Sequence, residues 1–563
     1  MLHYFDIRKW PYGLWIIPIG LLLYLPMLGG SHLFDWDEIN FAEIAREMIV
    51  TRDWLKLQMA FEPFYEKPPF FFWMQALSMK YFGISSFGAR LPNALIGVVT
   101  LWTLYTIGRR LQGSGFGMLW AMVYAVSMLP FLYFKSALID PTFNLFIFLA
   151  IYFLAQMTES WEFVPSNRRK KRRFRAMRLC GLFMGLAILT KGPVALFLFS
   201  LVFVAYFIMS RFRRIVRLNE AIVMLVSMGL VLSIWILLYV QQEGWAFFGA
   251  FLQRHFELGG QADAGHGGFM GYHVLVLFVG TFPCAPLIFS AWKKRDEYSA
   301  LTQNFVLWMV ITLITVLVVF ELVQTKIMHY SSLAYFPMTY LASLRLWMLA
   351  KHKEALRWWE ISLLVVLSLL FFAAMVLIYF IGNNPSLLWT NIAINDVFAL
   401  DNLKASVVWP ASILWLAGLF FMGMLVSLFI ANRGHGKGAV MGIILSVSIL
   451  VQSIVYLVVP RIEGYTQRAA IEIYKELAEK DVVVVTYGFK TYADHFYLKR
   501  KSEDIAHFEE VNTTTANGRS VYVVTRSNVV QNKGVPSEWI FLSNRNGFVL
   551  YEIPEDFLPK PKS

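Results

Sequence analysis

Cysteine and charge are both scarce in this chain. Its 563 residues include two cysteines, and Asp, Glu, Lys and Arg together make up 15%, whereas a soluble globular protein is nearer 25% charged. Cys180 and Cys284 lie far apart, in or beside apolar runs, which argues against a disulfide framework or a cysteine metal centre. No small-residue cleavage site follows the first apolar run, so we expect that run to be a retained span.

Long apolar runs, by contrast, recur along the whole sequence. Hydrophobic residues make up 58% of the chain, and the mean hydropathy is +0.55. The runs are long enough to cross about 30 Å of hydrocarbon, and the aromatic content of 17% fits interfacial belts. The net charge of +13 lies in short loops between the runs. It therefore reflects membrane topology and does not indicate a nucleic-acid partner.

We expect a polytopic α-helical membrane protein with about thirteen transmembrane helices. The stretch Leu179–Met209 should cross twice, because both of its flanks are basic and Lys191-Gly192-Pro193 breaks it. The expected spans are Trp10–Leu28, Leu91–Ile107, Gly117–Phe134, Pro141–Met157, two within Leu179–Met209, Ala221–Val240, Tyr272–Trp292, Phe305–Phe320, Ser331–Leu349, Ile361–Ile381, Val407–Ile430 and Ala439–Val459.

Basic clusters orient these spans. Arg8 and Lys9 precede the first span, and Asn167–Arg178 is the strongest cytoplasmic signal in the chain. We therefore expect a cytoplasmic N-terminus and a long first loop, residues 29–90, on the outer, periplasmic face. The transmembrane domain should cover residues 1–460.

Residues 461–563 are expected to form a small soluble α/β domain on the periplasmic side. Gln467–Lys480 has the pattern of an amphipathic helix, and three short segments have the pattern of strands: Val482–Thr486, Val521–Thr525 and Trp539–Leu542. This domain shows no nucleotide or metal motif.

The first outer loop concentrates acids beside the membrane, in the sequence FDWDEINFAEIAREM at 34–48. The apolar residues of Phe41–Met48 recur at helical spacing, which predicts an amphipathic helix lying at the membrane interface. Asp35 and Glu38 fit a capping box as well as they fit catalysis. Asp37 is left over once that box is assigned, so it is the better chemical candidate.

A second motif in this loop, YEKPPFFFW at 65–73, pairs a lysine with two prolines. Proline suits the first turn of the predicted helix Phe70–Phe82. Lys67, just before that helix and near lipid headgroups, is suited to binding phosphate, although a snorkelling lysine would look the same. Further polar residues are expected on the same face: Asp140, Lys191, Arg254, His255, Asp263, His266, Lys326, His329 and Tyr330.

An acid near phosphate-binding cations suits the transfer of a sugar from a lipid-linked sugar phosphate. Asp37 would act as general base on the acceptor, and Lys67 would stabilise the departing phosphate. The membrane supplies the donor, so no nucleotide-binding domain is required. The alternatives are a multi-span transporter of a polar or lipid-linked substrate, although no internal repeat is visible, and a non-catalytic partner that assembles through the C-terminal domain.

The motifs DEINFAEIAREM, DW and YEKPP-x(3)-W together resemble the polyprenyl-phosphate-dependent glycosyltransferases of the GT-C fold. The pattern is most similar to the lipid A aminoarabinose transferases, which are related to the protein O-mannosyltransferases, and it covers nearly the whole chain. The resemblance implies a bacterial inner-membrane enzyme. It would move a sugar from a polyprenyl (undecaprenyl) phosphate to a lipid A-like lipid, a glycan or a protein on the periplasmic face.

The resemblance also implies roles for individual residues. It gives Asp37, Glu38 and Asp140 as the catalytic acids. It pairs Glu66 with His266 at a possible zinc site, where His255 or His273 could replace His266. The substrate contacts that it implies are Tyr65, Lys67, Lys191, Arg254, Lys326, His329 and Tyr330.

One departure from the family pattern concerns the substrate. The aminoarabinose transferases usually have Arg and Tyr where this chain has Asn40 and Phe41. Loss of the guanidinium removes a bidentate anion contact. This departure puts the aminoarabinose donor, or the lipid A phosphate acceptor, in doubt, whereas the fold and the lipid-phosphate donor class are less affected.

Overall fold

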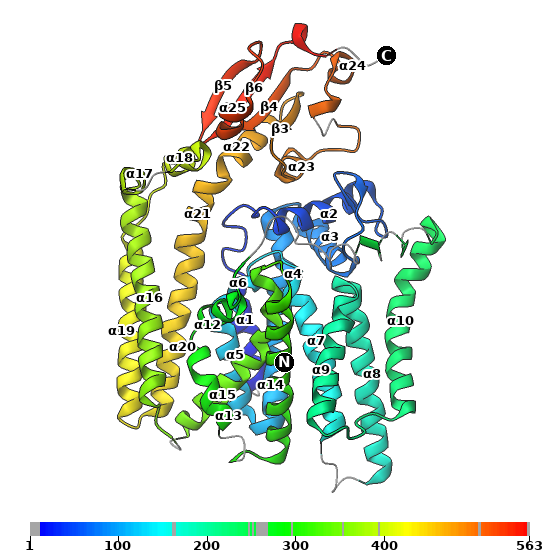
Figure 1. Cartoon of the computed structure of the whole chain (residues 1–563), viewed down its shortest axis with the longest axis vertical. Coiled ribbons are helices and arrows are strands. Elements are labelled where there is room, and N and C mark those ends of the chain that lie inside the picture. The colour runs from blue at the N-terminus through cyan, green and yellow to red at the C-terminus, as the bar shows by residue number, and fades with distance from the viewer. Residues whose placement is uncertain are drawn as a thin grey trace, which may run out of the picture.

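Long helices form a bundle, and a smaller sheet domain is stacked on one end of it (Figure 1). This computed structural model describes residues 12–159, 165–245, 248–249, 251, 253–254, 268–293, 297–351, 354–391, 394–504 and 508–559. A mostly helical, multi-pass architecture with a small C-terminal sheet is what the sequence predicts.

Each of the thirteen predicted spans corresponds to a helix or to a bent pair of helices. Among the described residues, seven stretches are long and apolar enough to cross a membrane: α4 (Ser86–Gln112), α7 with its last turn (Asp140–Thr158), α10 (Leu218–Glu243), α14 (Ala300–Leu322), α16 (Trp358–Asn383), α19 (Ser412–Asn432) and the run through α20 (Gly436–Ser453) and α21 (Val459–Thr466).

Two further spans are bent. The helices α5 (Ser114–Val126) and α6 (Met128–Phe134) meet at 76°, and α12 (Tyr272–Gly280) meets the stretch Ala285–Lys293, which ends in α13 (Ile288–Lys293), at 98°. The remaining four helices are shorter or partly charged: α1 (Ile16–Tyr24), α8 (Ser166–Lys191), α9 (Val194–Met209) and α15 (Tyr335–Ala350). The break between α8 and α9 falls at Gly192, with φ of 88°, so the predicted turn at Lys191-Gly192-Pro193 is confirmed.

The first loop folds over one end of the bundle. It contains α2 (Asp37–Thr51), a two-stranded ribbon of β1 (Gln58–Met59) and β2 (Glu62–Pro63), and α3 (Phe70–Phe82), which has the predicted bounds. The prediction that α2 is an interfacial amphipathic helix is wrong. Ten of its fifteen residues are buried, including charged ones, because the sheet domain covers its polar face.

The C-terminal domain is a four-stranded sheet of order β3-β4-β6-β5. Its strands are β3 (Val483–Tyr487), β4 (Val521–Arg526), β5 (Ile540–Arg545) and β6 (Phe548–Ile553); β3 runs parallel to β4, and the other pairs are antiparallel. Sequence reasoning missed β6. Its hairpin with β5 turns at Asn546-Gly547, both at positive φ, and Asn-Gly is the strongest short-range hairpin signal.

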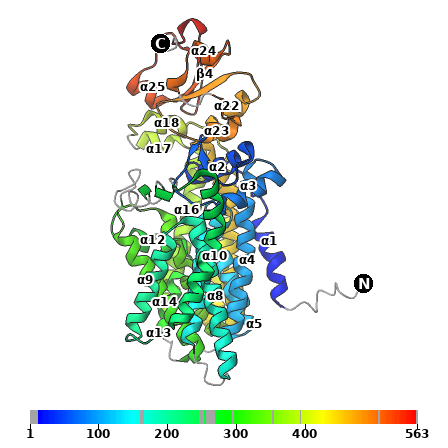
Figure 2. The ribbon, with the colours of Figure 1, turned by 90° about the vertical axis from the view of Figure 1, so that its right-hand side faces the viewer.

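Short helices join the sheet to the bundle. Figures 1 and 2 both show the sheet domain directly beyond α2 and α3, and α21 carries the chain across the expected boundary at residue 460. The helices around the sheet are α22 (Arg468–Leu477), α23 (Ala493–Leu498), α24 (Thr513–Ala516) and α25 (Ser527–Lys533); α17 (Ser386–Asn391) and α18 (Val397–Leu403) follow α16.

Candidate active site

Asp37 is the first residue of α2 and stands at the mouth of a cavity. Trp36, the residue before it, provides no side-chain cap for α2. Within the described residues, the basic group in reach of the Asp37 carboxylate is His329, whose Nε2 lies 3.8 Å away. Its side chain is 43% exposed. A carboxylate that is accessible at the start of a helix can reach a substrate in the cavity, as a general base must.

The cavity has a volume of about 690 Å³. Its polar lining includes Asp37, Lys135 and His329, beside the paired Glu38 and Arg90. Its apolar walls include Met27, Leu132, Leu138, Val455 and Val459. The last two belong to the end of the final span. A cavity that joins a carboxylate to apolar walls near a membrane span fits an amphiphilic molecule.

His329 stands between two acids. It lies in a 3-10 helix, η7 (Met328–Ala334), and its Nε2 is 3.8 Å from both Asp37 Oδ2 and Asp140 Oδ2. Both distances exceed a hydrogen bond. Burial lowers the pKa of His329, although the charge of Asp140 opposes that shift, so the imidazole is neutral near pH 7.

Asp140 and Lys191 form a tight pair. Asp140 starts α7, Lys191 ends α8, and Nζ of the lysine donates to Oδ1 of the acid over 2.6 Å. The same ammonium lies 5.5 Å from the ring centroids of Phe143 and Tyr330. A cation at a helix C-terminus is favoured by the helix dipole. Asp140 therefore orients Lys191 and is not free to take a proton.

Lys67 is a cation with no carboxylate within ion-pair distance among the described residues. It is partly buried just before α3. Burial lowers its pKa; the charge of Glu66 opposes the shift, and that of Lys191 adds to it. A desolvated ammonium close to a second ammonium attracts an anion, and two such cations suit a phosphate.

Glu38 is saturated. Arg90 donates to it from Nε (3.0 Å) and Nη2 (2.7 Å), and the backbone N–H groups of Phe34 and Ala137 complete its shell. Despite burial, the charge and hydrogen bonds of Arg90 hold the pKa of Glu38 below its usual range. Glu38 therefore fixes the start of α2 to α4 and to the loop before α7.

The capping-box interpretation of Asp35 is wrong. The side chain of Asp35 accepts from Thr491 in the sheet domain, and Trp36 occupies the N-cap position. The backbone N–H of Asp35, which Glu38 would bond in that box, donates to Gln467 instead, and Glu38 accepts from the backbone N–H of Phe34. Neither half of the predicted box forms, because residues distant in sequence bond both the side chain and the N–H of Asp35.

Three predicted substrate contacts have other partners. Lys326 donates to the carbonyls of Phe320 and Glu321 at the end of α14. Arg254 donates to Glu66 over 2.7 Å. Tyr65 packs in an aromatic cluster with Trp235, Tyr239 and Phe251.

The zinc site predicted at Glu66 stays a prediction. His266 and the alternative His255 lie outside the described residues, as does Asp263. The third histidine, His273, is buried with Nδ1 3.1 Å from Ser331 Oγ. Glu66 is already paired with Arg254, and the reaction proposed below does not require a metal at this position.

Sequence reasoning missed Lys135 as a cavity residue. It is 8% exposed, lines the cavity with Asp37 and donates to the carbonyl of Pro26. Burial lowers its pKa to about 8. Its position in FKSALID, five residues before Asp140 in an expected outer loop, was the available signal.

A second cavity, of about 740 Å³, lies between the first loop and the sheet domain. Its lining includes His32, Glu463, Arg468 and Lys475 and none of the predicted site residues. The predicted residues Asp37, Glu38 and His329, by contrast, line the cavity at Asp37.

Comparisons with known proteins agree with this geometry. The chain has the GT-C fold of membrane glycosyltransferases: its structure matches "Crystal Structure of ArnT from Cupriavidus metallidurans bound to Undecaprenyl phosphate" with a TM-score of 0.74, over 98% of this chain and 99% of that one, at 18% identity. Residues 66–239 match the family of dolichyl-phosphate-mannose-protein mannosyltransferases.

Proteins of similar sequence indicate the kind of glycosyltransferase more closely. An undecaprenyl phosphate-α-4-amino-4-deoxy-L-arabinose arabinosyl transferase of Pseudomonas fluorescens (strain Pf0-1) is 30% identical over 319 residues, 53% of this chain and 52% of that protein. The transferase of the same name from Pectobacterium carotovorum is 27% identical over 330 residues, 56% and 55% of the two chains. The match thus spans about half the length of these relatives. The predicted resemblance to the lipid A aminoarabinose transferases and the mannosyltransferases is confirmed.

Proposed function

We propose that this protein is a glycosyltransferase that moves a sugar from a polyprenyl phosphate to an acceptor. The observation that carries the proposal is the contrast between its acids. Asp37 is accessible and near enough to Lys67 for the two charges to interact, whereas Glu38 and Asp140 are each engaged by a cation. The named activity of the relatives, transfer from undecaprenyl phosphate, belongs to the same chemistry.

The acceptor end of the reaction centres on Asp37. The acceptor oxygen attacks the anomeric carbon, and its proton passes to the Asp37 carboxylate. The bond from that carbon to the phosphate oxygen breaks, and its electron pair leaves with the lipid phosphate. Because Glu38 and Asp140 are both engaged, neither is free to act as a nucleophile. The reaction is then a single displacement, which inverts the anomeric configuration.

The donor end of the reaction centres on Lys67 and Lys191. Two cations stabilise the charge that builds on the phosphate as it leaves. Asp140 holds Lys191 in place at 2.6 Å, which fixes the geometry before the donor arrives. His329, neutral and 3.8 Å from both acids, has room to donate to either one as the substrate closes the site.

We expect the acceptor to be an amphiphilic molecule. The cavity at Asp37 has apolar walls from the last span together with Lys135. Phe41, which departs from the usual family residue, packs edge-on against Phe71 and Phe72 at 6.0 and 5.7 Å, so it does not replace a missing anion contact. A lipid A-like lipid fits the cavity best, and glycan and protein acceptors are the alternatives.

Charge bias supports the orientation. The helix α2, which begins with Asp37, and the sheet domain lie at one end of the bundle (Figure 1), and the basic start of α8 lies at the other. By the positive-inside rule, the N-terminus is cytoplasmic and the site faces the periplasm across the inner membrane.

The test uses purified full-length protein, a polyprenyl phosphate carrying a labelled sugar, and candidate acceptors. We expect labelled acceptor and free polyprenyl phosphate in equal amounts. Label that enters closed vesicles without leaving its lipid would instead support the transporter alternative, which the transferase relatives do not favour. For the Asp37→Asn variant, Glu62→Gln is the matched control, because Glu62 is an exposed acid of the same loop.

A further inference from the structure

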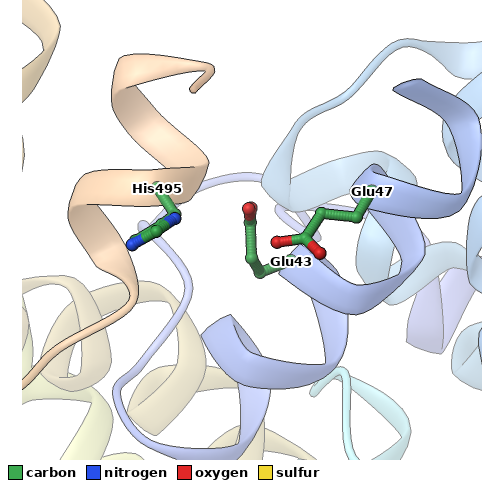
Figure 3. Close-up of side chains that lie close together, drawn as sticks. All are labelled: Glu43, Glu47 and His495. Atoms are coloured by element: carbon green, nitrogen blue, oxygen red, sulfur yellow. The ribbon is translucent and has the colours of Figure 1, made fainter. Parts of the chain in front are cut away.

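The polar face of α2 meets α23 of the sheet domain at a buried cluster. Glu43 and Glu47 lie four residues apart, so they share one face of α2, and both point toward His495 of α23 (Figure 3). Their side chains are 0%, 0% and 4% exposed. One carboxylate oxygen from each acid and one ring nitrogen of the histidine all lie within 4.8 Å of one another.

Two atoms of this cluster have no hydrogen-bond partner among the described residues. They are Glu47 Oε1 and His495 Nδ1. The other oxygen of Glu47 accepts from the backbone N–H of Phe61 over 2.9 Å. Buried polar atoms are almost always bonded, so two orphans in one cluster point to a missing partner that accepts electron pairs from both.

The charge balance points the same way. Arg46 donates to both oxygens of Glu43, at 2.6 and 2.7 Å, and neutralises that carboxylate while leaving each oxygen a second lone pair. Glu47 has no such cation. Within the described residues its buried charge is therefore left without a counterion, and a bound cation would supply one.

We propose that Glu43, Glu47 and His495 bind a divalent transition-metal ion, with zinc the best match to two carboxylate oxygens and one imidazole nitrogen. The ion fastens the helix that begins with Asp37 to the sheet domain. Asp494 is the nearby carboxylate: its Oδ2 lies 4.0 Å from His495 Nε2, beyond a hydrogen bond, and pairs with Arg500 at 2.8 Å. This site is separate from the one predicted at Glu66, and it does not depend on the proposed reaction.

The site would stabilise the protein without taking part in the chemistry. Glu43 lies six residues beyond Asp37, about 9 Å along the helix axis at 1.5 Å per residue. An ion that binds the folded protein and not the unfolded one raises the unfolding temperature in proportion to the logarithm of its concentration. Metal content and thermal stability therefore report on the site independently of transfer activity.

The test uses the full chain, stripped of metal with a chelator and then titrated with Zn²⁺ alone. A Glu66→Gln background removes any contribution from the other predicted site. In that background we expect one equivalent of bound zinc and a zinc-dependent rise in unfolding temperature. Adding Glu47→Gln or His495→Gln should abolish both, whereas adding Glu62→Gln, at an exposed acid of the same loop, should change neither.

A cluster that holds a proton in place of a metal ion would give a different result. If Glu43 and Glu47 share a proton instead, the background protein will bind no zinc at this cluster, and Glu47→Gln, which mimics the protonated acid, will be as stable as its parent. That result would overturn the proposal. Because Glu47→Gln keeps the shape of the side chain and removes a buried charge, the comparison does not rely on a variant that fails to fold.

Discussion

At the scale of single residues, what separates the acids of this site is access. Asp37, Glu38 and Asp140 are all carboxylates at or near helix starts, but Asp37 alone of the three is substantially exposed. The lysines divide in the same way: Lys191 is paired with Asp140, whereas Lys67 has no carboxylate within ion-pair distance in the described part of the chain. Residue type and position in the sequence predicted these acids and lysines, whereas the ion pairs in the structure indicate the role of each one.

Lys67→Ala should weaken binding of polyprenyl phosphate by about 10- to 100-fold, because a charge-assisted hydrogen bond contributes about 1.5–3 kcal/mol. The dissociation constant, measured by isothermal titration in detergent, checks this. Lys80→Ala is the control, since Lys80 is an exposed lysine on α3 of the same loop. Equal effects of the two substitutions would remove Lys67 from the phosphate site.

Binding of the donor phosphate should also depend on pH. Burial lowers the pKa of Lys67 in the free protein, and a bound phosphate favours the protonated form, so binding takes up a proton. Affinity is then greatest below the lowered pKa and falls as the pH rises through it. Dissociation constants at about pH 7 and about pH 9.5 should differ for the wild type and much less for Lys67→Arg, whose guanidinium stays protonated. A pH dependence unchanged by Lys67→Arg would contradict the assignment.

At the scale of elements, α2 and α3 show what sequence periodicity reveals and what it misses. The apolar run after Pro68-Pro69 determines α3, and its bounds are as predicted. The pattern of α2 is equally helical, but its polar face is buried by α23, more than 400 residues away in sequence. Periodicity identifies a polar face and cannot say whether water or another domain covers it.

The anchor of α2 on α4 gives a prediction at this scale. Arg90→Met leaves Glu38 buried without its cation, which should cost about 3–5 kcal/mol of unfolding free energy. Adding Glu38→Gln should recover part of that loss, because the buried charge is gone. Chemical unfolding of the three proteins in detergent measures the difference. A double variant less stable than the single one would show that Glu38 does not depend on Arg90.

At the scale of the whole molecule, the first loop and the C-terminal domain share one hydrophobic core. Residues of α2 and α3 pack in the same cluster as Ile471, Tyr474 and Phe496. Polar contacts cross the same boundary: the backbone N–H of Leu33 donates to the Tyr497 hydroxyl over 3.0 Å, and His32 pairs with Glu463. The C-terminal domain is thus part of what holds the helix of Asp37.

Removing residues 461–563 should therefore expose the first loop. We expect proteolysis within residues 29–90 at least tenfold faster than in the full chain, with loss of transfer, because about 25 cal/mol of stabilisation is lost for each Å² of apolar surface uncovered. Limited proteolysis with mass spectrometry measures the cleavage sites. A loop that stays protected in the shortened chain would mean that the bundle alone holds it.

The sequence predicted the order of the spans and most members of the site. The structure brings Asp37, Lys67, Asp140, Lys191 and His329 together, although they come from five separate parts of the chain. Lys326, also predicted to contact the substrate, donates instead to a carbonyl at the end of α14. Lys135 was missed as a cavity residue: its place in an expected outer loop was a local signal, but its burial depends on helices distant in sequence.

The most direct test of the central claim is the single-turnover rate of sugar transfer by Asp37→Asn at saturating donor. If Asp37 is the general base, the rate should fall by about 10²- to 10⁴-fold, while the dissociation constant for polyprenyl phosphate changes little, because the lysines are intact. A single-turnover rate within about threefold of wild type would contradict the account, since asparagine cannot accept the acceptor's proton.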